Sequence, residues 1–299
     1  TRKESSAASD VYKRQFYNDM KGFFEMRIVT DSSANIVDYK DMNLGVAPLH
    51  IIVGDMDYVD DDMVDIDAMQ KKLSSYKGKT STASPSPEEW ERAFGNDDII
   101  FCITITSGLS GTYNSALAAK GKYESEHKGS RVFIIDSLST GPEIELIAEK
   151  AQELIGTGAS PDEIYNRLIE YKEKTHLYFS LASVKNFAKN GRINPVVATG
   201  IDFLGIKIVG KASEEGTLLP MDKCRGEKKA LNKLVNHLKK CGYKNGKIII
   251  AHNNNETGAE ELSKLIEDEF GLFNGKINKT RALCSYYAEP GSILIGFEA

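Results

Sequence analysis

In Ile103-Thr-Ile-Thr-Ser107-Gly-Leu-Ser110-Gly111-Thr112-Tyr113-Asn-Ser-Ala116, an apolar run that begins at Ile99 gives way to small and hydroxyl residues, and a helix-like segment rich in alanine follows. A buried strand that stops at such residues exposes backbone N–H groups and hydroxyls at the start of a helix. Ligands usually bind at the carboxyl edge of an α/β sheet. The stretch therefore predicts a site for a carboxylate or a phosphate.

A second hydroxyl-rich patch runs from Lys79 to Pro87 and is followed by an acidic helical turn. Ser86 before Pro87 is typical of a helix N-cap. On its own the patch indicates only a capped loop. Together with Ser107, Ser110 and Thr112 it becomes a candidate second half of the same anion site.

Strand-like and helix-like segments alternate along the chain, which favours a parallel sheet covered on both faces. Strands are expected at Arg27–Thr30, Leu49–Val53, Ile99–Ile105 and Val132–Asp136, and helices at Asp65–Tyr76, Glu88–Phe94, Asn114–Glu126, Glu143–Ile155 and Asp162–Lys174. A second region offers strands at Leu177–Ser183, Ile206–Gly210, Lys247–His252 and Ile293–Phe297, and helices at Val184–Lys189, Arg225–Cys241 and Thr257–Phe270. The prediction is a two-domain α/β protein, with an N-terminal domain at 26–165 and a C-terminal α/β domain at 166–299.

Composition narrows the class of protein. The net charge of −5 argues against nucleic acid or an anionic membrane surface as the main partner. No apolar run approaches the roughly 18 residues of a membrane helix, so no integral membrane association is expected. The scattered cysteines Cys102, Cys224, Cys241 and Cys284 form no C-x-x-C pair, which favours a reduced, cytoplasmic protein. Residues 1–25 show no clean period and are interpreted as a non-native or disordered leader, with an amphipathic targeting or interaction arm as the alternative.

Other chemistries have weaker signals. The acidic cluster from Asp55 to Asp62 lacks the glycine and the final glutamate of a calcium loop, so a solvated turn is expected rather than a metal site. The histidines show no zinc-binding spacing. Gly108-Leu-Ser110-Gly111 resembles a nucleophile elbow, but Thr112 stands where the last glycine is required. A serine hydrolase that uses Ser110, Asp136 and His252 stays open as an alternative.

Eight motifs occur together in one order, from Met26 to the C-terminus. They are Met26-Arg-Ile-Val-Thr-Asp-Ser-Ser33, Lys79-Thr-Ser81 with Ser84-Pro85, Ser107-Gly-Leu-Ser-Gly-Thr-Tyr113, Ile134-Ile-Asp-Ser137, Asn190-Gly-Arg-Ile193, Gly205-Ile-Lys207, Lys223-Cys-Arg225 and Glu289-Pro-Gly291. Each motif alone is weak, but in this order they resemble the DegV family of bacterial fatty-acid-binding proteins. The resemblance implies a DegV-like fold, a bound long-chain fatty acid and a separate fatty acid kinase as partner.

The resemblance also implies roles for individual residues. Thr80, Ser81 and Ser110, with the backbone N–H groups of Gly111 and Thr112, are the expected carboxylate donors. Arg192 and Arg225 match family positions near the mouth of the pocket and are expected to face the partner or a phosphate. No metal is expected, because neither the histidines nor the acidic cluster has metal-binding spacing. No cofactor other than the bound fatty acid is expected, and the chain has no phosphate-binding loop for a nucleotide.

One motif departs from the family pattern. The family usually reads H-x-G-P-G near the C-terminus, where this chain has Tyr287-Ala-Glu289-Pro-Gly291. Tyr287 takes the histidine position and is expected to donate one hydrogen bond to the carboxylate, without the positive charge of an imidazolium. The sequence therefore predicts a fatty-acid-binding protein that is not itself an enzyme. The alternatives are a lipid hydrolase that uses Ser110 and a binding module for another amphiphilic anion.

Overall fold

The N-terminal half is built on a four-stranded parallel sheet. The computed structural model describes residues 25–39, 42–193 and 205–299, so the expected leader lies outside the described residues except for Glu25. The strand order is β2 (Leu44–Ala47), β1 (Met26–Asp31), β6 (Ile99–Thr104) and β7 (Arg131–Asp136), and all neighbours pair in parallel. Every residue of β6 is buried, as its apolar run predicts for a central strand.

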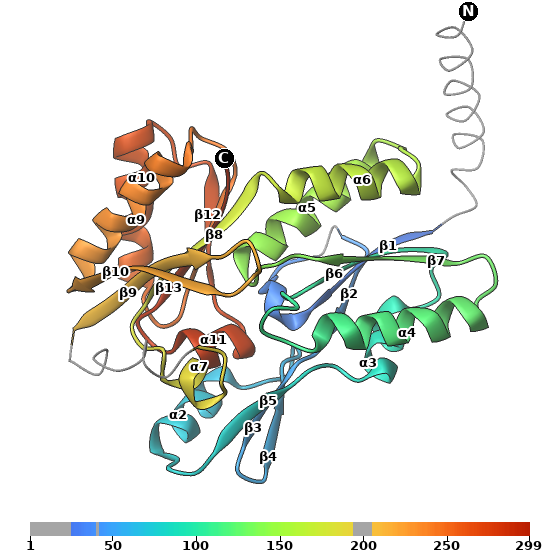
Figure 1. Cartoon of the computed structure of the whole chain (residues 1–299), viewed down its shortest axis with the longest axis horizontal. Coiled ribbons are helices and arrows are strands. Elements are labelled where there is room, and N and C mark those ends of the chain that lie inside the picture. Colours follow the sequence, from blue (N-terminus) through green and yellow to red (C-terminus); the bar gives the residue numbers. More distant parts are fainter. Residues whose placement is uncertain (1–24, 40–41, 194–204) are drawn as a thin grey trace, which may run out of the picture.

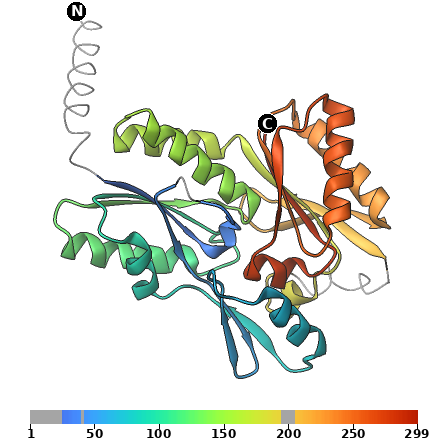
Figure 2. The same cartoon turned by 180° about the vertical axis from the view of Figure 1, so that it is seen from behind.

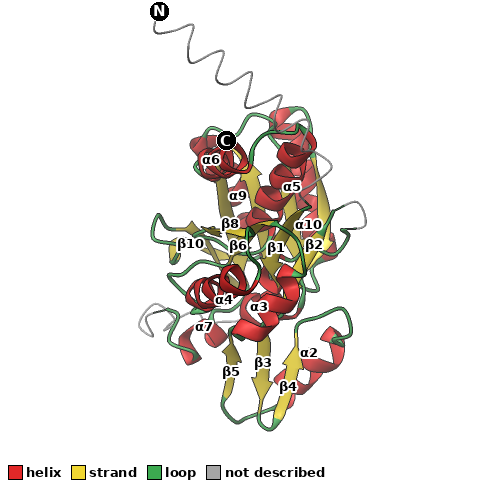
Figure 3. Cartoon of the chain, turned by 90° about the vertical axis from the view of Figure 1, so that its right-hand side faces the viewer, coloured by secondary structure: helices red, strands yellow, loops and turns green. Residues whose placement is uncertain are grey.

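Helices cover both faces of this sheet, which confirms the predicted layer arrangement (Figure 3). On one face, α3 (Pro87–Phe94) and α4 (Thr112–Glu126) bury Trp90, Phe94 and Tyr123 against the strands. On the other face lie α5 (Pro142–Gly156) and α6 (Pro161–Lys172). Complete capping boxes begin α3 at Ser86 and α6 at Ser160, so these two starts are fixed by local sequence.

A separate three-stranded antiparallel sheet corrects one expectation. The predicted strand at Leu49–Val53 forms as β3 (His50–Val53), but it pairs with β4 (Met56–Val59) and β5 (Thr80–Ala83) rather than with the parallel sheet. Gly54, with a φ of +64°, makes the tight turn between β3 and β4. The hydroxyl patch expected as a loop is thus partly a strand. The helix α2 (Ile66–Ser75) connects β4 to β5.

The C-terminal half is a six-stranded sheet that is mostly antiparallel. Its order is β10 (Leu218–Arg225), β9 (Ile206–Ala212), β8 (Thr175–Leu181), β13 (Ile293–Glu298), β11 (Ile248–His252) and β12 (Gly275–Lys279), and only β11 and β12 pair in parallel. The helices α9 (Glu227–Cys241) and α10 (Glu256–Phe270) cover its outer face, as the light-orange and orange-red helices on the right of Figure 2 show. The inner face turns toward the N-terminal half.

Two helices join the halves. Figure 1 shows α5 between the two large sheets and α11 (Ala282–Ala288) close to the small sheet. Leu283 and Tyr286 of α11 belong to the same buried cluster as the strands of the N-terminal half. The predicted division at residues 165 and 166 falls inside α6, and the chain enters the second sheet only at β8. None of the helices in the described ranges combines the length and apolar character that crossing a bilayer needs.

The acidic cluster after β3 is solvated at Asp55, Asp57, Asp61 and Asp62, as expected, but it also contains one buried carboxylate that the sequence did not predict. Asp60 is fully buried, and its oxygens accept the backbone N–H groups of Ala282 at 3.1 Å and Leu283 at 2.9 Å. The Nε of Arg281 lies 3.6 Å from Oδ1 of Asp60. Burial raises the pKa of Asp60, while Arg281 and the helix N–H groups act in the opposite direction. The carboxylate caps α11 and holds it on the N-terminal half.

His50 connects the small sheet to α3. Its Nδ1 lies 2.9 Å from Asp57 and its Nε2 lies 3.1 Å from Glu89. Burial works to lower the pKa of His50, but the two carboxylates outweigh it and raise the pKa above the ordinary 6.5. A raised pKa in the folded state contributes stability that is complete below the unfolded pKa and is lost as pH rises through the folded pKa.

We therefore expect His50→Gln to lower the free energy of unfolding more at about pH 5.5 than at about pH 8.5, by up to about 1 kcal/mol because the pair is partly exposed. Urea unfolding at both pH values measures this. The control is His176→Gln, because burial and Lys211 lower the pKa of His176 and its pH trend should have the opposite sign. A His50→Gln effect that is the same at both pH values would contradict the assignment.

Candidate functional site

A cavity lies where the carboxyl edge of the N-terminal sheet meets the inner face of the C-terminal sheet. The loops that follow β6 and β7 line one side of it, and β8 with the hairpin between β9 and β10 lines the other. The helices α7 (Lys185–Lys189) and α11 close it from a third direction. The empty space between these walls is about 820 Å³, with the open solvent at the mouth included.

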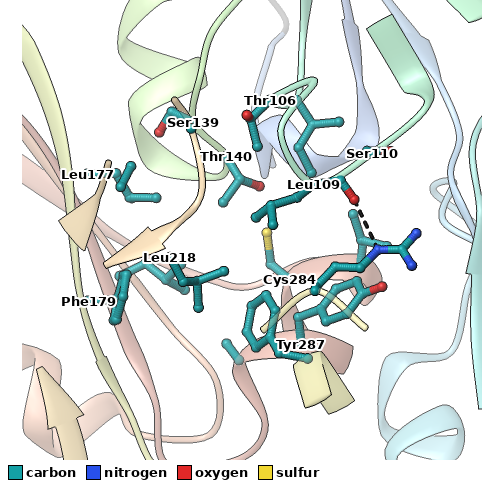
Figure 4. A pocket seen from close by; sticks show the side chains of 18 of the residues that line it. Thr106, Leu109, Ser110, Ser139, Thr140, Leu177, Phe179, Leu218, Cys284 and Tyr287 are labelled. Carbon is teal, nitrogen blue, oxygen red and sulfur yellow. Dashed lines mark hydrogen bonds between the residues drawn. The ribbon is translucent and has the colours of Figure 1, made fainter. Parts of the chain in front are cut away.

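Most of the cavity wall is apolar. The second half of the chain supplies most of the apolar side chains that line it, among them Leu177, Phe179, Leu181, Phe187, Ala212, Leu218, Leu283 and Leu294. The first half adds Leu49, Ile105 and Leu109. Figure 4 shows Leu177, Phe179 and Leu218 at one side of the cavity and Ser110 and Tyr287 at the other. The cavity therefore has an apolar end and a polar end.

Hydroxyl groups gather at the polar end in two hydrogen-bonded sets. Thr82 Oγ1 lies 2.8 Å from Tyr287 Oη, and Ser110 Oγ lies 2.7 Å from Thr112 Oγ1 and 3.4 Å from Ser84 Oγ. Each hydroxyl has one hydrogen to donate. The Thr82–Tyr287 pair uses one of its two hydrogens in its single bond, and the set of Ser84, Ser110 and Thr112 uses two of its three hydrogens in its two bonds. Each set therefore keeps one hydrogen for a further acceptor. A carboxylate, which only accepts hydrogen bonds, is suited to both.

A guanidinium adds positive charge at this end. Arg192 lines the cavity, where its Nε donates to Leu109 O at 3.0 Å and its Nη1 donates to Asn190 O. Burial raises the pKa of the Tyr287 phenol, while the hydrogen bond from Thr82 and the charge of Arg192 act to lower it. Tyr287 is thus a neutral donor next to a cation, and the polar end is suited to an anion.

Two further hydroxyl residues of the wall, Ser139 and Thr217, are paired with other protein groups. Ser139 Oγ donates to the buried Glu143 at 2.5 Å, and Thr217 Oγ1 lies 2.9 Å from Ser213 Oγ. Burial raises the pKa of Glu143 to about 7, against the hydrogen bonds from Ser139 and Thr175 that lower it. Ser139 donates its one hydroxyl hydrogen to Glu143, whereas the Ser213 and Thr217 hydroxyls share one bond and keep one hydrogen. Among the lining residues of the described chain only Arg192 carries a positive charge, and this charge distinguishes the polar end as the place for an anion.

The expected site residues are only partly gathered at the cavity. Ser110, Arg192 and Tyr287 line it, and Thr112 supports Ser110 from the first turn of α4. Gly111 precedes that turn as the N-cap and is not among the lining residues.

The other expected residues lie away from the lining. Thr80 is buried, and its hydroxyl lies 2.7 Å from Tyr286 Oη. Ser81 and Arg225 are not among the lining residues of the described chain, and Arg225 ends β10 as an exposed residue.

Thr82 is a cavity residue that the sequence interpretation missed. Thr80 and Thr82 lie on the same face of β5, since side chains alternate along a strand, and their hydroxyls bond to the adjacent tyrosines of α11. The alternation of two β-branched threonines is a strand signal that was available in the sequence. It does not say which of the two reaches a ligand, because that depends on how α11 docks.

The hydrolase alternative fails on geometry. The hydroxyl of Ser110 bonds to Ser84 and Thr112, and no histidine is among its partners in the described part of the chain. His252 is buried in β11, where its Nδ1 accepts the N–H of Asn255. Asp136 accepts the N–H groups of Ser107 and Leu138 instead of a histidine. Among the residues that the structure describes, no histidine is placed to act as a general base for Ser110. Across the described residues no three histidine, cysteine or carboxylate side chains are grouped to hold a metal ion.

Two solved structures with the same architecture hold fatty acids. A crystal structure of a DegV family protein from Eubacterium eligens, loaded with heptadecanoic acid, superposes with a TM-score of 0.90 at 42% identity and covers 92% of this chain and 100% of that one. The Streptococcus pneumoniae Fatty Acid Kinase (Fak) B3 protein, loaded with linoleic acid, gives a TM-score of 0.88 at 40% identity, with coverages of 91% and 99%.

Sequence comparison agrees with the structural one. A DegV domain-containing protein of Streptococcus pneumoniae is 43% identical over 251 residues, which is 84% of this chain and 89% of that protein. The family model described as "Uncharacterised protein, DegV family" matches residues 25–299, which includes every motif noted in the sequence. The chain belongs to the DegV family.

Proposed function

We propose that this protein binds one long-chain fatty acid, with the acyl chain in the cavity and the carboxylate at its polar end. The observation that carries the proposal is the pairing of a long apolar wall with one cluster of hydroxyls and a guanidinium. Structures of 40% and 42% identity hold linoleic and heptadecanoic acid, which supports the same ligand class here. Another amphiphilic anion is the competing ligand.

The apolar end of the cavity would supply most of the affinity, and the polar end would orient the ligand. Burial of each methylene is worth about 0.8 kcal/mol, so about 14 buried methylenes would contribute on the order of 11 kcal/mol before the entropic costs of binding. A carboxylate buried without donors would cancel much of that gain. Thr82, Ser110, Arg192 and Tyr287 are our candidates for those donors.

We further propose that the bound acid is presented to a separate fatty acid kinase. One structural neighbour is itself named Fatty Acid Kinase (Fak) B3 protein. On this proposal the protein is a carrier and not an enzyme, and the kinase supplies the nucleotide and the metal. Arg225, exposed at the end of β10, is the candidate contact for the partner or for phosphate. A cytoplasmic location fits the four free cysteines.

Replacement of Arg192 tests the recognition of the carboxylate. We expect wild-type protein to prefer heptadecanoic acid over its methyl ester, because only the acid is charged. Arg192→Ala should lower affinity for the acid by about tenfold to 150-fold, the range for a lost hydrogen bond to a charged group, and should barely change affinity for the ester. Isothermal titration with both ligands measures this. Arg225→Ala is the control and should keep the wild-type preference; a wild type that binds acid and ester equally would contradict the proposal.

Replacement of Tyr287 tests the residue that departs from the family pattern. Tyr287→Phe removes the hydroxyl that bonds to Thr82, and we expect it to weaken binding of heptadecanoic acid by about 0.5–1.5 kcal/mol. Tyr123→Phe is the control, because the Tyr123 hydroxyl also donates a hydrogen bond, to Asp97 O at 3.0 Å, but its ring packs in the separate cluster beneath α3 and α4. It should lose stability without losing affinity. A Tyr287→Phe protein that binds as tightly as wild type would remove the phenol from the site.

A further inference from the structure

Glu289 has a backbone conformation that favours glycine. It follows α11 with φ 54° and ψ 157°, a region that side chains other than glycine rarely adopt. The DegV pattern has glycine at this position, so the chain carries a strained glutamate where an unstrained residue is usual. Such strain persists only where the surrounding structure holds it.

The side chain of Glu289 is held by the start of α7. Its Oε1 accepts the hydroxyl of Ser183 at 2.8 Å and the backbone N–H of Asn186 at 3.2 Å. Ser183 precedes α7 and Asn186 lies in its first turn. The carboxylate therefore connects the end of α11 to the beginning of α7, two segments more than 90 residues apart in the sequence.

Further contacts fasten α7 along the same side of α11. Asn186 Nδ2 donates to Tyr286 O, and Asn190 Nδ2 donates to Tyr286 Oη, both at 2.8 Å. The rings of Phe187 and Tyr287 pack in a tilted arrangement with their centres 4.7 Å apart. These contacts place α7 against the helix that carries the phenol of the polar end.

Arg192 follows directly from this docked helix. Its backbone N–H donates to Phe187 O at 2.8 Å, and its guanidinium reaches Leu109 O across the cavity. A shift of α7 away from α11 would therefore carry Arg192 away from Tyr287 and from the loop after β6. The position of the cation depends on the attachment of a five-residue helix.

We propose that Glu289 is a positioning residue, whose carboxylate clamps α7 onto α11 and thereby fixes Arg192 at the polar end of the cavity. The proposal rests on the proposed fatty-acid function. It gives a reason for the strained backbone, because the clamp needs a carboxylate side chain at a position where only glycine would be free of strain. Glu289 itself does not line the cavity.

Two substitutions of Glu289 distinguish the effect of its carboxylate on ligand preference from the effect of its strained backbone on stability. Glu289→Gly relieves the strain and removes the clamp, so we expect thermal stability to stay near the wild-type value while the preference for heptadecanoic acid over its methyl ester falls by about tenfold or more. Glu289→Gln keeps an oxygen acceptor for Ser183 and Asn186 and should retain most of the preference. If Glu289 only capped α7 locally, Glu289→Gly would change thermal stability and leave the preference for acid over ester intact.

Controls keep the outcomes distinct. Asn245→Gly relieves another non-glycine residue of positive φ, at 107°, remote from the cavity lining, and should leave the acid-to-ester preference unchanged. Ser183→Ala removes one partner of the carboxylate and should lower the preference in the same direction, by less, even if Glu289→Gly proves unstable. A Glu289→Gly or Ser183→Ala protein that keeps the full wild-type preference overturns the clamp. A wild type without any acid binding instead overturns the proposed function.

Discussion

The carboxylate of Asp60 is the contact on which the site depends. It is fully buried, and it is stabilised there by the first N–H groups of α11 and by Arg281. Removal of these partners would leave an uncompensated charge in the core, which is costly. Because α11 comes from the C-terminal half and Asp60 from the N-terminal half, this contact joins the two halves. It also sets where Tyr286 and Tyr287 meet the threonines of β5.

The cavity follows from that junction. The N-terminal sheet presents loops with small and hydroxyl residues at its carboxyl edge, and the C-terminal sheet presents an apolar inner face. Neither surface is a complete site alone. The loops of the N-terminal sheet supply few of the apolar lining side chains, and the inner face of the C-terminal sheet supplies few hydrogen-bond donors. Together they form a chamber with an apolar wall and one polar end, to which α7 adds a cation through Arg192. The polar end is therefore a product of tertiary docking between segments distant in the chain.

This dependence explains what the sequence could and could not predict. The apolar runs of β6, β7 and β11 and the capping boxes of α3 and α6 carry local signals, so those elements were predicted correctly. The short helix α11 was not predicted, because a seven-residue segment buried on most sides has no clear period. The burial of Asp60 had no local signal either, as its partners lie 222 and 223 residues away. For the same reason Thr82 could not be told apart from Thr80.

The lipid content of the purified protein decides whether the cavity holds a fatty acid. The full chain would be expressed in bacteria, purified without detergent and extracted, and the extract quantified by mass spectrometry against protein concentration. We expect long-chain fatty acid at close to one molecule per chain, displaceable by added heptadecanoic acid. Protein that carries no fatty acid, and takes up none when it is supplied, would contradict the proposed fatty-acid-binding function.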